Sequence, residues 1–243
     1  MNPIVWTEDA VRAALGERNV LALETSVRES SVALATPAGI RTANLGTAAA
    51  HASDLLPEIA RLIEEAGLAP ANLDAIFVGL GPGSYTGLRV GIATALGLAR
   101  GTGAELQGIP SVEALAGKHL VENGSVSVLL DARGGAAYHA RYERDGSAWI
   151  ERVAPRAIAV KSASAGLAEG DAILGDTTIA DRANLTAEQR ERLITDALVL
   201  GGERLTPEAT GVLEHAALRF ALEGALPAEQ LEPLYLRAFG EQA

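Results

Sequence analysis

The chain has 243 residues, a length that suggests one or two domains, and its 48% hydrophobic and 21% charged residues indicate a packed core rather than a disordered chain. The formal net charge of −11 excludes the basic footprint with which free-standing nucleic-acid binders replace phosphate counterions. Cysteine is absent, which excludes disulfides, thiolate metal sites and cysteine nucleophiles.

Residues 1–19 are expected to form an N-terminal extension with a short amphipathic helix that ends at Gly16. This segment has neither a basic start nor a long apolar run, so no signal peptide is expected. The sequence holds no run of about 18 apolar residues free of charge, and no membrane span is expected. Together with the lack of cysteine, these features favour a cytoplasmic protein.

The first half of the molecule is expected to comprise residues 20–110, in which strands and helices alternate. Short apolar runs predict strands at 20–24, 30–35, 40–45, 73–79 and 105–109. Apolar residues at helical spacing predict helices at 53–66 and 86–100. This order predicts a mixed sheet flanked by helices.

The second, divergent half is expected to comprise residues 111–243. A helix is predicted at 111–121, and strands are predicted at 125–130, 136–144, 148–153 and 172–174. Residues 155–169 are predicted to be helical. A further helix is predicted at 207–222, with Thr206 as its cap and Pro207 in its first turn, and it is free to pack back on the first half. The fold class is therefore α/β, with two similar halves and a hinge near residues 103–125.

A glycine-rich segment, residues 79–91, lies between a predicted strand and a predicted helix and holds five glycines. Such a loop can cradle a phosphate, because free N–H groups and the helix dipole attract anions there. However, neither the dinucleotide fingerprint nor the P-loop pattern is matched. The serine-hydrolase pattern G-x-S-x-G is not matched either, and Ser84 is expected to cap the helix instead.

Small residues recur every four positions along this helix, at Gly83, Gly87, Gly91, Ala95 and Ala99. A glycine inside a helix costs roughly 1 kcal/mol relative to alanine, so two of them need a compensating contact. The stripe packs either on the protein's own sheet or closely against a helix of another molecule. Both interpretations stay open at this point.

Several motifs point to one family; they are Val20–Ser26, Ser31–Leu34, His51 with Leu55–Pro57, Gly81–Arg89, Gly91–Ala93, Asp131–Arg133 with Tyr138, and Pro233–Arg237. Together they resemble the TsaB (YeaZ-like) family. The resemblance is good over residues 20–135, thin beyond them and absent from residues 1–19. Its most specific part is Gly81–Arg89, which reads GPGSYTGLR.

The resemblance implies an actin-like ATPase fold and a non-catalytic dimerisation subunit of the bacterial machinery that puts a threonylcarbamoyl group on the tRNA adenosine 3′ of the anticodon. It implies a catalytic paralogue, TsaD, and an ATPase, TsaE, as partners, a homodimer when the chain is alone, and contact with tRNA only through the complex. We expect the two helices at 53–66 and 86–100 to form the partner interface. Its expected residues are His51, Asp54, Leu55, Glu58, Gly83, Tyr85, Gly87, Arg89, Gly91 and Ala95.

Catalysis by the chain itself is not expected. In actin-like enzymes the first hairpin carries an aspartate that helps to place metal and phosphates, whereas this chain has Glu24, whose extra methylene moves the carboxylate by more than about 1 Å. Glu24, Thr25, Ser26, Asp131 and Arg133 are therefore expected to mark a vestigial nucleotide cleft. Alternatively, Asp131 lies in a tight turn and bonds to backbone or to Arg133.

No metal and no cofactor are expected, because the histidines are scattered, at positions 51, 119, 139 and 215, and form no paired zinc motif. The main alternative function is a free-standing ATPase or small-molecule kinase of the same fold. A weaker alternative is a metallopeptidase-like hydrolase.

Overall fold

The computed structural model describes residues 4–5, 8–27, 29–47, 51–119, 123–146, 148–175, 179, 182–191, 193–194 and 206–236. The chain divides into two compact units, and each contains one sheet. The first unit comprises residues 5–114 and 207–234; the second comprises residues 1–4, 115–206 and 235–243. The predicted α/β class is confirmed.

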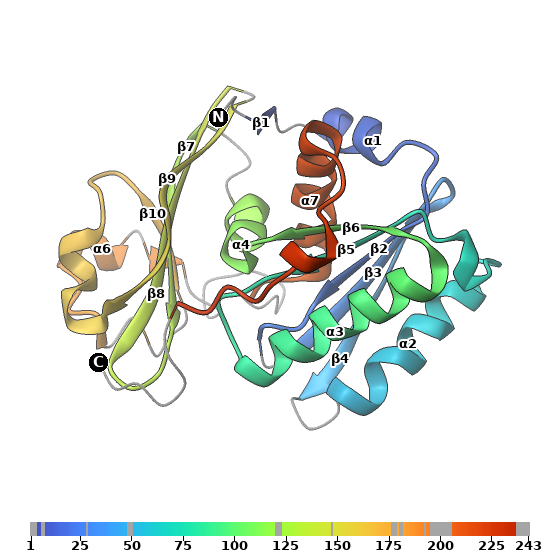
Figure 1. Ribbon diagram of the computed structural model, residues 1–243. Helices are drawn as coiled ribbons and strands as arrows, with labels where there is room; N and C mark the ends of the chain where they lie inside the picture. The colour runs from blue at the N-terminus through green and yellow to red at the C-terminus, as the bar shows by residue number, and fades with distance from the viewer. Residues whose placement is uncertain are drawn as a thin grey trace. The chain divides into compact units, whose positions relative to one another are not determined.

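The first unit is built on a five-stranded mixed sheet in the order β4-β3-β2-β5-β6 (Figure 1). Its strands are β2 (Val20–Glu24), β3 (Glu29–Thr36), β4 (Gly39–Thr47), β5 (Ala75–Gly79) and β6 (Glu105–Ile109). The first three are antiparallel neighbours, and β5 and β6 run parallel to β2. Every residue of β2 and β5 is buried, because helices cover both faces of the sheet centre.

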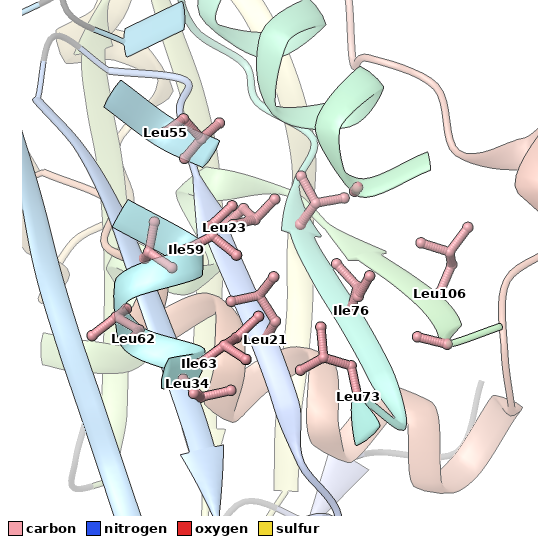
Figure 2. Packing of buried hydrophobic residues seen from close by; sticks show 14 of the residues in the cluster. Leu21, Leu23, Leu34, Leu55, Ile59, Leu62, Ile63, Leu73, Ile76 and Leu106 are labelled. Atoms are coloured by element: carbon pink, nitrogen blue, oxygen red, sulfur yellow. The ribbon is translucent and has the colours of Figure 1, made fainter. Parts of the chain in front are cut away.

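One face of this sheet packs against α2 (His51–Glu65) and α3 (Tyr85–Thr102). Figure 2 shows Leu55 and Ile59 of α2 next to Leu23 of β2. The other face packs against α7 (Ala209–Glu223), and α1 (Glu8–Leu15) packs on α7 in turn. The short 3-10 helices η1 (Pro70–Asn72) and η3 (Ala228–Gln230) complete this unit.

Helix α7 belongs to the first unit, so this C-terminal helix packs back on the first half, as the sequence left open. Its predicted cap is wrong: the helix begins at Ala209, and the residue in the cap position is Glu208, whose side chain makes no capping bond. Instead, the hydroxyl of Ser31 on β3 accepts the N–H of Ala209 at 2.8 Å. Ser31, which is distant in sequence, thus satisfies a backbone N–H in the first turn of α7 that a local capping residue would otherwise bond.

The second unit contains a six-stranded sheet in the order β1-β9-β8-β7-β10-β11. Its strands are β1 (Ile4–Val5), β7 (Gly124–Asp131), β8 (Ala136–Asp145), β9 (Ala148–Ala159), β10 (Ala172–Gly175) and β11 (Leu193–Ile194). The other elements beyond β6 are α4 (Ser111–His119), η2 (Val160–Gly166) and α6 (Ala187–Glu191). Strands β7, β8 and β9 form an antiparallel meander, and β10 and β11 extend it in parallel.

The predicted helix at 155–169 is wrong over residues 155–159, which belong to a strand, and the part that follows is a 3-10 helix and not an α-helix. Strand β9 continues to Ala159, because its residues pair with β8, as Arg156 does with His139 and Ile158 with Ala137. Tertiary pairing here overrides a weak local preference for helix. Only Val160–Gly166 turns, as the 3-10 helix η2. Across the described residues, no helix is long and apolar enough to cross a membrane.

Candidate functional site

The glycine-rich segment 79–91 wraps around the turn that follows β2. The N–H of Ser84 donates to the carbonyl of Ser26 at 2.6 Å, and the hydroxyl of Thr25 donates to the carbonyl of Gly87 at 2.8 Å. Ser84 caps α3, as predicted, and its hydroxyl accepts the N–H of Gly87 at 3.2 Å. The N–H groups of Ser84 and Gly87 at the start of α3 are therefore bonded within the chain and are not available to an anion.

The small-residue stripe on α3 faces this turn. A Cβ added at Gly83, Gly87 or Gly91 would come much closer than 3.0 Å to atoms of Ser26 or Thr25. Ala95 continues the stripe into the core and is fully buried. Leu55 of α2 is 1% exposed and points into the same core (Figure 2). Leu55, Gly87, Gly91 and Ala95 are thus buried within the chain and Gly83 is half-buried, and their contact with a partner stays a prediction on which the proposal below does not rely.

A second row of small residues runs along the opposite side of α3. Ala93, Gly97 and Gly101 are exposed and follow Arg89 at intervals of four residues. A Cβ added at Gly97 or Gly101 would have no heavy atom within 4 Å. This side of α3 is thus a shallow surface that leaves room for another backbone.

Helix α2 lies beside α3 and adds larger apolar residues to the exposed side. Leu56 is 52% exposed, and Pro57 and Ala60 are exposed near it. We call the exposed side of the two helices the outer face; it comprises Leu56, Pro57 and Ala60 of α2 and Ala93, Gly97 and Gly101 of α3. An apolar row of this kind on a helix pair is typical of a surface that packs on another protein.

Charges flank the outer face unequally. Helix α2 carries Asp54, Glu58, Glu64 and Glu65 against a single arginine, Arg61, whereas α3 carries Arg89 and Arg100 and no acidic residue. Of the expected interface residues, Asp54 and Arg89 are exposed and Glu58 and Tyr85 are half-buried. The guanidinium of Arg89 lies 4.1 Å from the ring centre of Tyr85. The side chain of His51 lies outside the described part of the structure.

The residues expected to mark a nucleotide cleft divide between the two units. Glu24 and Thr25 are fully buried in the first unit, and Ser26 is 2% exposed. In the second unit, Asp131 Oδ1 accepts the N–H of Arg133 at 2.9 Å and pairs with Arg182 at 3.1 Å. These bonds favour the tight-turn interpretation of Asp131, and a nucleotide cleft remains a prediction.

Two buried polar clusters escaped the sequence analysis. The carboxylate of Asp171 pairs with Arg141 at 2.9 Å and accepts the hydroxyls of Ser125 and Ser127. In the first unit, the fully buried Glu113 pairs with Arg219 at 2.7 Å and with His215 at 3.6 Å. No local spacing signals either cluster, because each joins residues from distant strands or helices.

The described residues hold no group of three or more histidine, aspartate and glutamate side chains arranged to bind a metal ion. His139 is fully buried on β8, and burial lowers its pKa to about 4, with the charge of Arg156 acting in the same direction. Burial by itself raises the pKa of Glu113, but the bond from His215 and the charge of Arg219 hold it below its ordinary value. In the cluster of Asp171 and in that of Glu113, each carboxylate is paired with an arginine of the same cluster, as in structural ion-pair networks.

Comparison with known proteins identifies the family. Residues 45–182, more than half of the chain, match the family model described as "TsaD: tRNA N6-adenosine threonylcarbamoyltransferase". The chain is 29% identical over 233 residues to the "tRNA threonylcarbamoyladenosine biosynthesis protein TsaB" of Escherichia coli K12, covering 90% of this chain and 94% of that protein. The protein of the same name from Haemophilus influenzae is 29% identical over 230 residues, covering 90% and 93%.

The structural comparison agrees with the sequence matches. A solved structure titled "YeaZ from Pseudomonas aeruginosa" superposes with a TM-score of 0.75 and 26% identity, covering 90% of this chain and all of that one. The chain therefore shares the fold of this YeaZ structure, and its two α/β units, each with a mixed sheet and helices, are those that the sequence predicted. The chain belongs to the TsaD family, and its relatives over almost its whole length are named TsaB.

Proposed function

We propose that the chain acts in tRNA threonylcarbamoyladenosine biosynthesis as a non-catalytic subunit, which binds and activates a TsaD-type catalytic paralogue through the outer face of α2 and α3. The names of its relatives support the pathway. The observation that carries the binding mode is the exposed row of Ala93, Gly97 and Gly101 on α3, together with the exposed Leu56 on the adjoining helix α2. Side chains this small let two helix backbones approach closely and bury their flanks.

The chemistry of the outer face favours a partner that resembles this chain. The chain matches a TsaD family model, so a TsaD-type paralogue is expected to present a related pair of helices. In a two-fold contact, α2 of one molecule meets α3 of the other, which places the acidic flank of α2 on the basic flank of α3. Opposite charges at the rim guide association and fix the register of the helices.

The same face would serve a homodimer when the catalytic paralogue is absent, because a two-fold contact joins like patches. We propose further that a TsaE-type ATPase joins the assembly and that tRNA is held only by the complex. The net charge of −11 supports this division, since another subunit must supply the cations that neutralise tRNA phosphates.

The alternative of a free-standing ATPase or kinase needs an open phosphate site. The carboxyl of Glu24 is buried and the N–H of Ser84 is bonded to Ser26, so neither group is free to meet a nucleotide from solvent. ATP turnover by the isolated chain, measured by phosphate release, distinguishes the two functions. Robust turnover that is lost on mutation of Asp131 would establish the alternative.

A matched pair of substitutions tests the binding mode. Ala93→Leu places a large side chain in the middle of the outer face, whereas Ala13→Leu makes the same change at an exposed position of α1. We expect Ala93→Leu to weaken binding to the TsaD-type paralogue by about 100-fold or more, because backbones can no longer approach. Ala13→Leu is expected to leave the Kd unchanged.

Isothermal titration gives the Kd, and thermal unfolding shows that both variants are folded. Modification of tRNA by the reconstituted complex is expected to follow the binding. The binding mode is wrong if Ala93→Leu binds the paralogue as tightly as Ala13→Leu does and supports the same rate of modification.

A further inference from the structure

Glu24 is a buried carboxyl group whose contacts lead to the outer-face helix. It is the last residue of β2 and is fully buried. Its Oε1 accepts the N–H of Ser26 at 2.6 Å. Its Oε2 lies against Gly79 and near the hydroxyl of Ser111, with no donor directed at it in hydrogen-bond geometry. No side chain would fit at position 79, because a Cβ there would overlap this carboxyl group.

The two neighbours of this carboxyl hold the two ends of the loop that leads into α3. Ser26 accepts the N–H of Ser84, the cap of α3, at 2.6 Å. Ser111 accepts the N–H of Gly81 on its hydroxyl at 3.0 Å and donates its own N–H to the carbonyl of Gly81 at 2.7 Å. The side chain of Glu24 therefore lies between the two serines that bond the loop at Gly81 and at Ser84.

The residue between Glu24 and Ser26 fixes the helix itself. Thr25 donates its hydroxyl to the carbonyl of Gly87 and packs against Gly91, one turn further along. These contacts set the depth and rotation of the first two turns of α3. Because a helix is stiff over this length, they also determine which side of α3 faces outward at Ala93 and Gly97.

The electrostatic surroundings favour the protonated acid. Burial raises the pKa of Glu24 above its ordinary value of 4.5, while the neighbouring polar groups of Ser111, Ser26 and Thr25 act in the opposite direction. The polar groups that act on it are hydroxyls and amides, which carry no charge. Protonation would turn Oε2, which accepts no hydrogen bond in the structure, into a donor for an acceptor nearby such as the Ser111 hydroxyl.

We propose that Glu24 is a positioning residue for partner binding: its carboxyl group couples the turn after β2 to the start of α4 and thereby holds α3 in the orientation that presents the outer face. This inference rests on the proposed function for the partner. The positioning itself is a property of the isolated chain and is measured without a partner.

Amide hydrogen exchange of the segment 79–91 tests the positioning. Glutamine copies the protonated acid, since its oxygen accepts from Ser26 and its amide donates toward Ser111, so Glu24→Gln is expected to keep protection within about threefold of wild type. Glu24→Asp withdraws the group by one methylene and is expected to lose at least about tenfold protection in this segment. Protection of α7 serves as the internal control.

Ser111→Ala removes the hydroxyl that accepts the N–H of Gly81. This variant tests the positioning of the segment if Glu24→Asp loses protection throughout the chain. It is expected to raise exchange at 79–84 while α7 stays protected. Affinity for the TsaD-type paralogue is expected to follow exchange: unchanged in Glu24→Gln and weakened by about tenfold or more in Glu24→Asp and Ser111→Ala.

The outcomes separate the two proposals. If wild type fails to bind the paralogue, the proposed function is wrong, whatever the exchange rates are. If both Glu24→Asp and Ser111→Ala keep wild-type protection at 79–91, or if Glu24→Gln loses as much protection as Glu24→Asp, Glu24 is not the positioning residue.

Discussion

Two glycines of α3 differ in the space around them, and they predict opposite effects of one substitution. Gly87→Ala forces a methyl group into the carbonyl of Thr25, so we expect a loss of about 2–3 kcal/mol in the free energy of unfolding, as overpacked cores show. Gly97→Ala adds a methyl group in open space and is expected to gain about 0.5–1 kcal/mol through helix propensity. Denaturant unfolding of both variants measures the two signs. Equal effects would show that position 87 has as much room as position 97.

The sequence indicated that α3 has small-residue stripes but not which of them faces inward. Gly83, Gly87 and Gly91 form one row and Ala93, Gly97 and Gly101 the other, so hydrophobic periodicity does not separate the two sides. What separates them is the turn after β2, whose Thr25 meets only the first row. That contact spans more than sixty residues of sequence and has no local signature.

His139 predicts how stability depends on acid. Its pKa is lowered from 6.5 to about 4 in the folded chain, by burial first and then by Arg156 and Arg141, with Asp171 opposing them. Between pH 6.5 and about 4, His139 is therefore protonated in the unfolded chain and neutral in the folded chain. The free energy of unfolding consequently decreases as pH falls through this window. The full cost is on the order of 2–3 kcal/mol.

His139→Leu removes this proton-binding difference while keeping the site filled. The unfolding free energy of wild type relative to the variant is expected to rise as pH rises from 4.5 to 6.5 and to stay constant above it. Measuring thermal unfolding across this range checks the slope. A difference independent of pH would mean that the imidazole is hydrated and titrates normally in the folded state.

At the scale of elements, the start of α7 depends on a strand that is 178 residues away in sequence. Ser31→Ala leaves the N–H of Ala209 buried and unpaired, so we expect a loss of about 1–2 kcal/mol. Ser53→Ala, at an exposed position of α2, is the matched control and is expected to stay within about 0.5 kcal/mol of wild type. Urea unfolding compares the two. If both variants have wild-type stability, water or another group satisfies Ala209.

The elements that local pattern predicted best are those with a strong period or a uniform apolar run, such as β2, α2 and β6. The predictions that failed concern residues whose secondary structure depends on pairing with a distant strand. Residues 155–159 have no alternation that marks a strand, and only their pairing with β8 extends them. The segment also contains Pro155, which is tolerated because β9 lies near the edge of its sheet. Long-range pairing of this kind is not encoded within a local window.

At the scale of the whole molecule, the order of elements predicted the α/β class and the family motifs predicted the actin-like fold. The sequence did not give the composition of the compact units, because α7 enters the first unit by packing on β2 and β5 from a remote part of the chain. Our proposal keeps the candidate interface on the two helices that the sequence indicated, and this interface stays a prediction. The sequence did not indicate which side of each helix faces outward, since a helix assignment leaves its rotation undetermined.

The charge of the whole chain yields the last prediction, which concerns tRNA. Binding to tRNA draws most of its free energy from cations that replace phosphate counterions, whereas this chain carries a net charge of −11. At about 150 mM salt the isolated chain is therefore expected to leave the mobility of tRNA unchanged at concentrations up to about 10 μM. The complex with the TsaD-type paralogue is expected to shift the same tRNA, with an affinity that falls as salt rises. Because Ala93→Leu is expected to abolish assembly, adding this variant to the paralogue should produce no supershift, while Ala13→Leu should. Submicromolar binding of tRNA by the chain alone would show that it has a basic tRNA surface of its own and would overturn the assignment of tRNA contact to the complex.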